Sequence, residues 1–217
     1  MFVTFEGIEG SGKSTALRLL AAYLQERGHD PVLTREPGGS TLGRSLRPIL
    51  LDARTRGLSS RAELHLFLAD RAQHVAEIIR PALEAGQTVL CDRFSDSTLA
   101  YQGYGRGHDV ERLRRINAQA TGGLAPDLTL LLDLSVAEGL ERAGERNRAE
   151  GTVLSEGRFD SESLDFHERV REGYLALAAA EPGRIAVIDA TQAPEDVLLQ
   201  CLSALEERLH HRGTGIA

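Results

Sequence analysis

Cysteine, tryptophan and long apolar runs are scarce in this sequence, and each scarcity excludes something. The 217 residues contain two cysteines and no tryptophan. Cys91 and Cys201 form no C-x-x-C pair, so we expect neither a disulfide framework nor a zinc site, as is usual in a reducing cytosol. No apolar run approaches the roughly 18 residues of a membrane span, and the N-terminal residues begin a strand rather than an apolar leader. We therefore expect a cytoplasmic protein.

Positive charge is also in deficit. The chain has 25 lysine and arginine residues against 32 aspartate and glutamate residues, a formal net charge of −7. Nucleic acids and membrane surfaces require a broad basic face, so we expect neither partner. Anionic substrates would instead be held by local arginine clusters, which act within a Debye length of about 8 Å. The length favours a single α/β domain over residues 1–217.

One stretch near the N-terminus carries a specific signal. Gly7-Ile8-Glu9-Gly10-Ser11-Gly12-Lys13-Ser14, followed by Thr15, fits the phosphate-binding loop G-x-x-x-x-G-K-[ST]. Lys13 is the only lysine in the chain, and it stands where a compact ammonium should reach the β- and γ-phosphates. The Ser14 hydroxyl would ligate Mg²⁺. A strand-like run precedes the loop and a helical one follows it, so the stretch predicts binding of a nucleoside triphosphate.

Strands and helices alternate along the rest of the chain. Strand-like runs occupy residues 2–5, 31–34, 87–91, 128–134 and 184–188. This alternation predicts an α/β fold of three layers, with a five-stranded parallel sheet flanked by helices. A long helix is expected over residues 61–83, kinked or ended near Arg80 by Pro81. Residues 103–107 contain three glycines and are expected to form a loop.

Two patterns leave alternatives open. Phe67 and Arg71 are four residues apart and share a helix face, but spacing alone favours a core phenylalanine beside a surface arginine over a shared cavity. Arg142, Arg146 and Arg148 lead into a polar stretch ending at Gly157. They indicate either a solvated helix face or a mobile lid, at about residues 142–157, that closes over phosphates.

The phosphate-binding loop alone does not separate a kinase from a nucleotide-dependent switch. Switch proteins that bind guanine carry N-K-x-D, which cannot occur here because the only lysine lies in the loop. A small kinase fits the length and the internal arginines better.

A set of motifs makes the interpretation more specific. Gly7 to Ser14 is followed in order by Thr34-Arg35-Glu36-Pro37-Gly38-Gly39, Leu68 to His74, Asp92-Arg93-Phe94 and Ala100-Tyr101-Gln102-Gly103. In this order and at these separations, the set resembles the thymidylate kinase family, from residue 2 to about residue 192. The resemblance implies a three-layer P-loop kinase fold, ATP and dTMP as substrates, Mg²⁺ as cofactor and a homodimer.

The resemblance also implies residue roles. Phe67 would stack on thymine and Arg71 would bond its exocyclic oxygen, which reverses the interpretation from spacing. Arg93 would hold the dTMP phosphate with Arg35 nearby, and Asp92 would orient a Mg²⁺-bound water. Glu9 would lie near the sugar 3′-hydroxyl. The thymine and deoxyribose side would be lined by Thr98, Tyr101 and Gln102.

The loop also departs from part of the family. Some members have an arginine directly after the acidic residue of the loop, where this chain has Gly10. Members without it resemble the bacterial type, which supplies the charge from the lid, here from Arg142, Arg146 or Arg148. A kinase for another nucleoside monophosphate or for a deoxynucleoside remains the main alternative.

Overall fold

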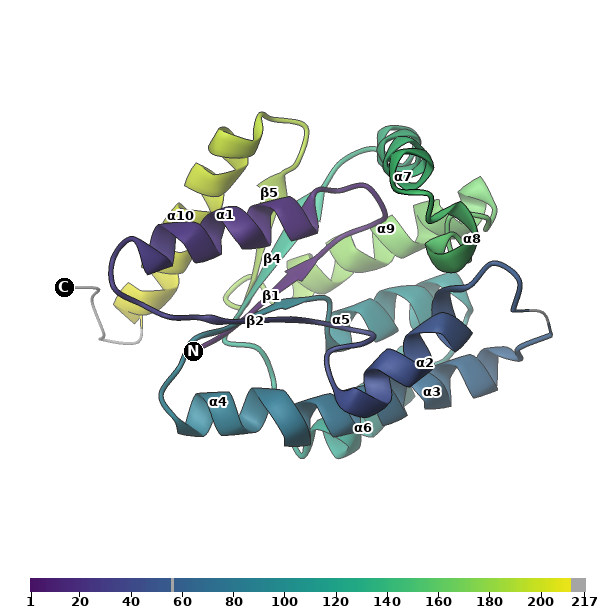
Figure 1. Cartoon of the computed structure of the whole chain (residues 1–217), viewed down its shortest axis with the longest axis horizontal. Coiled ribbons are helices and arrows are strands. Elements are labelled where there is room, and N and C mark those ends of the chain that lie inside the picture. Colours follow the sequence, from purple (N-terminus) through teal and green to yellow (C-terminus); the bar gives the residue numbers. More distant parts are fainter. Residues whose placement is uncertain (56, 212–217) are drawn as a thin grey trace.

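The fold is built around one parallel sheet. A computed structural model describes residues 1–55 and 57–211 (Figure 1). The strand order is β2-β3-β1-β4-β5, and every pairing is parallel. The strands are β1 (Phe2–Glu6), β2 (Val32–Arg35), β3 (Val89–Asp92), β4 (Leu128–Asp133) and β5 (Ile185–Asp189). The predicted five-stranded parallel sheet is confirmed.

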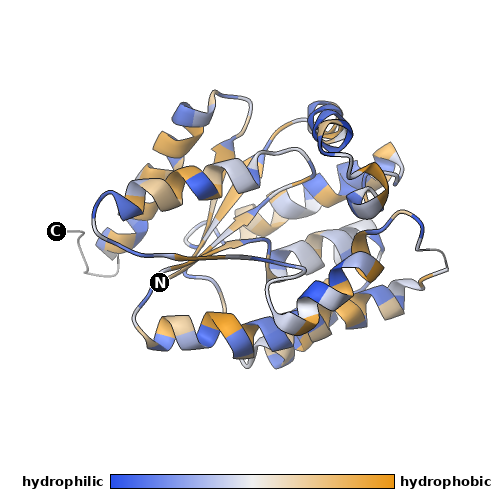
Figure 2. Ribbon diagram, in the orientation of Figure 1, coloured by the Kyte–Doolittle hydropathy of each residue, from blue (hydrophilic) through white to orange (hydrophobic). Residues whose placement is uncertain are grey.

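Burial follows strand position. β1 is buried throughout and β4 at every residue but its last, whereas the edge strands β2 and β5 alternate between covered and exposed residues. This matches the apolar runs expected of central strands covered on both faces. Figure 2 shows the same contrast between the mainly hydrophobic central strands and helices of mixed hydropathy.

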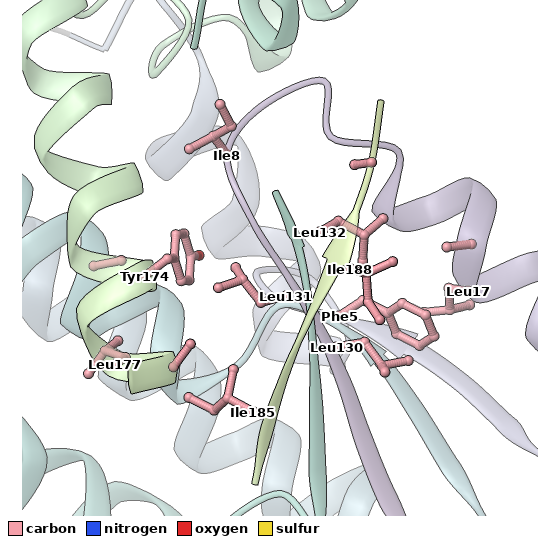
Figure 3. Packing of buried hydrophobic residues seen from close by; sticks show 14 of the residues in the cluster. Phe5, Ile8, Leu17, Leu130, Leu131, Leu132, Tyr174, Leu177, Ile185 and Ile188 are labelled. Atoms are coloured by element: carbon pink, nitrogen blue, oxygen red, sulfur yellow. The ribbon is translucent and has the colours of Figure 1, made fainter. Parts of the chain in front are cut away.

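Helices cover both faces of the sheet. On one face α1 brings Leu17 against Phe5 and Leu130, while on the other α9 brings Tyr174 and Leu177 toward the sheet (Figure 3). The helices are α1 (Lys13–Gln25), α2 (Thr41–Leu51), α3 (Ser60–His74), η1 (Val75–Ile79), α4 (Arg80–Glu84), α5 (Ser95–Thr98), η2 (Leu99–Gly105), α6 (Val110–Thr121), α7 (Val136–Glu150), α8 (Val153–Glu156), α9 (Leu164–Ala180) and α10 (Pro194–His211). Along the described chain, no helix has the length and apolar character needed to cross a membrane.

The long helix expected around residues 61–83 is present but not uniform. It runs as α3, then as the π-helical segment η1, and then as α4. Pro81 lies at the start of α4, directly after the π-helical residues. A proline cannot donate the backbone hydrogen bond of a regular helix, and π segments are a common way to absorb such a defect.

The prediction of a glycine-rich loop at residues 103–107 is wrong for residues 103–105, which belong to the π-helical segment η2. The glycines serve packing rather than a turn. A methyl group on Gly105 would lie 2.6 Å from the Phe166 ring of α9. On the opposite side of this contact, a methyl group on Gly173 of α9 would lie 2.6 Å from the Tyr104 ring. The absent side chains let η2 and α9 approach closely.

The strand order fixes where the site lies. β1 lies between β3 and β4; the chain runs from β1 to β2 on one side and later crosses from β3 to β4 on the other side, so the direction of winding reverses beside β1. In open parallel sheets, such a switch point opens a crevice at the carboxyl ends of the strands. The loop from residue 7 to residue 12 follows β1 directly and therefore lies at this crevice.

Candidate active site

The phosphate-binding loop forms an anion site at the start of α1. Gly12, the residue before the helix, has φ of 86° and offers no side-chain cap, and the first turn carries no acidic residue. Among the described residues no side chain caps the start of α1, and the positive end of the helix dipole faces the crevice. This is the geometry that binds phosphate.

Lys13 closes the loop from within. Its ammonium donates to the carbonyl oxygens of Ile8 at 2.6 Å and Gly7 at 3.2 Å and to Ser11 Oγ at 3.1 Å. Burial, and then the charge of Arg93, lower the pKa of Lys13 to about 7. The ammonium is therefore held in a place where it lacks sufficient negative charge, and phosphate would supply that charge.

Two hard oxygen donors meet beside the loop. Ser14 Oγ donates to Asp92 Oδ2 at 2.6 Å, joining the start of α1 to the end of β3. Across the described ranges, no cluster of three or more His, Cys, Asp or Glu side chains could hold a metal ion. Serine and aspartate oxygens suit Mg²⁺, which commonly takes one or two protein ligands plus phosphate oxygens.

A cavity of about 500 Å³ extends from this loop along the crevice. It continues past the end of β3 to the side chains of α3, and α7 borders it on another side. The predicted site residues that line it are Glu9, Gly10, Gly12, Lys13, Ser14, Thr15, Arg35, Phe67, Arg71, Asp92, Arg93, Thr98, Tyr101, Gln102, Arg142 and Arg146. Gly7, Ile8 and Ser11 lie behind the loop surface as partners of Lys13.

Arg71 is buried, with 1% of its surface exposed. Nε donates to Glu36 at 2.8 Å, Nη1 to Thr98 Oγ1 at 2.7 Å and to Asn117 Oδ1 at 2.5 Å, and Nη2 to the Phe94 carbonyl at 2.9 Å. Four of its five N–H groups are thereby used, and within the described part of the chain one Nη2 hydrogen remains for a ligand. The surface position that spacing alone favoured for Arg71 is therefore wrong.

Arg93 is held in an unusual backbone conformation, with φ of 69°. Its Nη1 donates to the Gly7 carbonyl at 2.9 Å and is shared with Tyr174 Oη at 3.2 Å and Ser97 Oγ at 3.3 Å. Nη2 donates to Glu9 Oε1 at 3.3 Å. Within residues 1–55 and 57–211, one edge of the guanidinium, formed by Nε and the second Nη2 hydrogen, has no partner, and this edge suits a bidentate contact with phosphate.

Glu9 connects the loop to the opposite wall. Tyr101 Oη donates to Glu9 Oε1 at 2.5 Å, and His167 Nδ1 lies 3.4 Å from Oε2. Burial raises the pKa of Glu9, but contact with His167 and the charges of Arg93 and Lys13 outweigh it and lower this pKa to about 2. Glu9 is ionised at neutral pH, and its Oε2 atom lacks a hydrogen-bond donor among the residues that the structure describes.

The three predicted lid arginines do not share one environment. Arg142 and Arg146, on α7, both line the cavity. Arg142 donates to the Ala190 carbonyl at 3.0 Å and Arg146 to Asn147 Oδ1 at 2.9 Å. Arg148 does not line it, because its Nε donates to the Gly144 carbonyl on the exposed side of α7. The helical spacing of the three arginines separates them in this way.

The segment after α7 is fastened to α2. Arg47 Nη2 pairs with Glu156 Oε2 at 2.9 Å, and the Ala53 and Arg158 amides donate to the carbonyls of Leu154 and Leu51 at 2.8 and 3.0 Å. Arg47 and Glu156 both line the cavity and were not predicted. The sequence holds no signal for this pair, since an arginine and a glutamate 109 residues apart are related only by the fold.

Comparisons with known proteins agree with this geometry. A family described as thymidylate kinase matches residues 5–200. The chain belongs to the thymidylate kinase family. A thymidylate kinase of Desulfovibrio desulfuricans is 76% identical over the full length of both chains, and one of Nitratidesulfovibrio vulgaris is 58% identical over 100% of this chain and 97% of its own. The solved thymidylate kinase of Ehrlichia chaffeensis superimposes with a TM-score of 0.76 at 36% identity, covering 94% of this chain and 98% of its own.

The low pKa of Lys13 predicts proton uptake when ATP binds. In the free protein Lys13 has a pKa of about 7, so it is only partly protonated just above pH 7. The negative charge of bound phosphate raises the pKa of Lys13. Up to one proton should therefore be taken up per site between about pH 7 and pH 9. Calorimetry at pH 8 in buffers of different ionisation enthalpy measures this uptake. In Lys13→Arg the guanidinium is always charged, so the uptake should vanish; ATP binding without proton exchange in the unsubstituted protein would contradict the assignment.

Proposed function

We propose that this protein phosphorylates dTMP to dTDP with ATP as donor. The observation that carries the proposal is one continuous cavity between the phosphate-binding loop and the pocket of Phe67 and Arg71. Two phosphate-bearing ligands bound at its two ends would meet near Arg93. Membership of the thymidylate kinase family supports thymidylate as the acceptor.

The donor half is the loop and the start of α1. Backbone N–H groups around Gly12 would surround the phosphates, and Lys13 would reach the β- and γ-phosphates. Mg²⁺ would be held by the Ser14 hydroxyl and, through water, by the Asp92 carboxylate. When bound, the ion neutralises charge on the phosphates. The turn of residues 190–193 would lie beside the adenine. Its Ala190 carbonyl accepts a hydrogen bond from Arg142.

The acceptor half is preorganised by buried pairs. Glu36 and Thr98 fix the Arg71 guanidinium so that its remaining Nη2 hydrogen can meet the exocyclic oxygen of thymine. Phe67 would stack on the ring.

The free edge of Arg93 would hold the dTMP phosphate, with Arg35 beside it, while Gln102 lines the same wall. Glu9 would lie near the 3′-hydroxyl, and Tyr101 beneath the sugar would discriminate against a 2′-hydroxyl.

The reaction needs no covalent intermediate on the protein, because the dTMP phosphate is already ionised at neutral pH. An oxygen of that phosphate attacks the γ-phosphorus of ATP, the bond to the β–γ bridging oxygen breaks, and ADP leaves with the electron pair. The transition state is loose, so the protein acts mainly by positioning and charge stabilisation. Lys13, Arg142 and Arg146 would offset charge on the transferring group.

The test of the function is an acceptor panel. Release of ADP from Mg-ATP is measured in a coupled assay with dTMP, dUMP, AMP, CMP, GMP and thymidine. We expect dTMP to be the best acceptor. Faster turnover of another monophosphate, or of thymidine, would favour the alternative kinase, and slow hydrolysis that no acceptor accelerates would favour a switch.

Phe67→Leu should weaken dTMP binding specifically. Leucine keeps the apolar contact with Phe159 but removes the ring, and base–aromatic stacking is worth about 1–3 kcal/mol. We expect the KM for dTMP to rise about tenfold, with the KM for ATP and the unfolding midpoint unchanged. A rise of both KM values together would indicate a general disturbance of the cavity instead.

The lid arginines provide their own matched control. Arg142→Gln and Arg146→Gln should each lower kcat by about 10²-fold, with a smaller effect on either KM, because a donor to the transition state is lost. Arg148→Gln should change kcat less than about twofold, since this exposed side chain lies away from the cavity. Equal defects in all three variants would disprove this assignment of roles.

Two broader expectations complete the proposal, namely a cytoplasmic location and a homodimer. Leu42 and Ile49, seven residues apart on α2, are 43% and 44% exposed and offer an apolar face for a second copy. A single species of monomer mass in sedimentation velocity at micromolar concentration would exclude the dimer.

A further inference from the structure

The phosphate-binding loop and the lid helix touch through two glycines. A methyl group built on Gly10 would overlap the carbonyl oxygen of Gly139 on α7 and would lie 3.0 Å from the Ala143 amide nitrogen. In the reverse direction, a methyl group on Gly139 would lie 2.6 Å from the Glu9 carbonyl oxygen and 3.0 Å from Ile8 Cδ1. Backbone therefore packs on backbone at this contact, with no room for a side chain from either partner.

The helix face that makes this contact is the face that carries the arginines. Counting along α7 from Gly139, Arg142, Ala143 and Arg146 follow at three, four and seven residues, which is the spacing of one helix face. Ala143 is fully buried, and both arginines line the cavity. How deeply α7 seats against the loop thus determines how far both guanidinium groups reach toward the phosphates.

We propose that Gly139, seated on Gly10, is a positioning residue for phosphoryl transfer. The pair sets the distance between α7 and the phosphate-binding loop, and through it the reach of Arg142 and Arg146. The inference rests on the role proposed above for these two arginines. It also gives a steric reason for the glycine after Glu9: any side chain at position 10 would displace the helix that supplies the positive charge, so an arginine in the loop and arginines seated in this way on α7 exclude each other.

The expected effect follows from the size of the overlap. Carbon–oxygen contacts below about 3 Å are essentially never observed, so a methyl group on Gly139 must push α7 outward by several tenths of an ångström. Catalytic groups must be held to about 0.5 Å, and a misplacement of about 1 Å can cost about 10²-fold in rate.

Gly139→Ala is the test, and Gly144→Ala is its matched control. Both glycines lie within α7, so alanine brings the same gain in helix propensity. At Gly144 the new methyl group would meet only Arg148 Nη2, at 3.9 Å. We expect Gly139→Ala to lower kcat at least about tenfold, with both KM values within about threefold, and Gly144→Ala to stay within about twofold of the unsubstituted protein. Equal kcat values for the two variants would overturn the proposal.

A double-mutant comparison separates positioning from a general structural role. In the Arg142→Gln/Arg146→Gln background the displaced helix has no guanidinium to misplace, so Gly139→Ala should cost less than about twofold. A repeated tenfold cost would show that Gly139 acts by another route. The number of dTMP-binding sites is measured by calorimetry, and kcat is expressed per binding site. If the Gly139→Ala protein binds no dTMP, the contact is required for folding and the proposal fails.

The same experiments distinguish this proposal from the one on which it rests. If Arg142→Gln/Arg146→Gln retains full kcat, the role of the lid arginines is wrong and the positioning role falls with it. If that variant is impaired while Gly139→Ala matches Gly144→Ala, only the positioning role is wrong.

Discussion

Repulsion between two polyanions is the constraint on which this structure depends. The chain is acidic overall, yet it must hold two phosphate-bearing ligands in one cavity. Two arginines proposed to hold the acceptor are each paired with a carboxylate: the buried Arg71 with Glu36 and the partly buried Arg93 with Glu9. A buried charge is costly unless it is paired and hydrogen-bonded. Among the described residues, this pairing leaves one Nη2 hydrogen of Arg71 and the edge of Arg93 formed by Nε and Nη2 without a partner, so both guanidinium groups are held in place before any ligand arrives.

The single lysine has a different task from the arginines. A guanidinium stays charged at any physiological pH, whereas the pKa of an ammonium shifts readily on burial. The pKa of Lys13 is lowered to about 7, because burial removes water from the ammonium and the positive charge of Arg93 lies nearby. Phosphate binding would therefore raise the pKa of Lys13, whereas the arginines stay charged with or without a ligand.

The structural features that depend on residues close together in the sequence were predicted correctly. The loop, the five strands and the order of elements follow from glycine spacing and apolar runs, and the structure agrees with them. Spacing misjudged Arg71 because its partners Glu36 and Asn117 lie 35 and 46 residues away. Residues 103–105 were predicted as a loop, whereas Gly103 makes room for side chains of α6 and Gly105 for side chains of α9. The separation of Arg148 from Arg146 depends on α7 continuing helically to Glu150, which the polar composition concealed.

The fastening of the segment after α7 to α2 determines how this cavity can exchange its contents. Glu156 lines the cavity and also pairs with Arg47, so the same side chain forms part of the cavity wall and attaches that wall to α2. The pair is partly exposed, at 18% and 37%, and ion pairs of this kind are worth at most about 1 kcal/mol. Two backbone hydrogen bonds add little more in contact with water. Other contacts hold the same segment: Arg158 Nη1 donates to the Leu50 carbonyl at 2.8 Å, and Arg158 Nη2 pairs with the buried Glu63 carboxylate. Phe159 both lines the cavity and belongs to the main hydrophobic core. Displacing this wall would therefore disturb buried contacts as well as the Arg47–Glu156 pair, so the cavity wall and the core share residues.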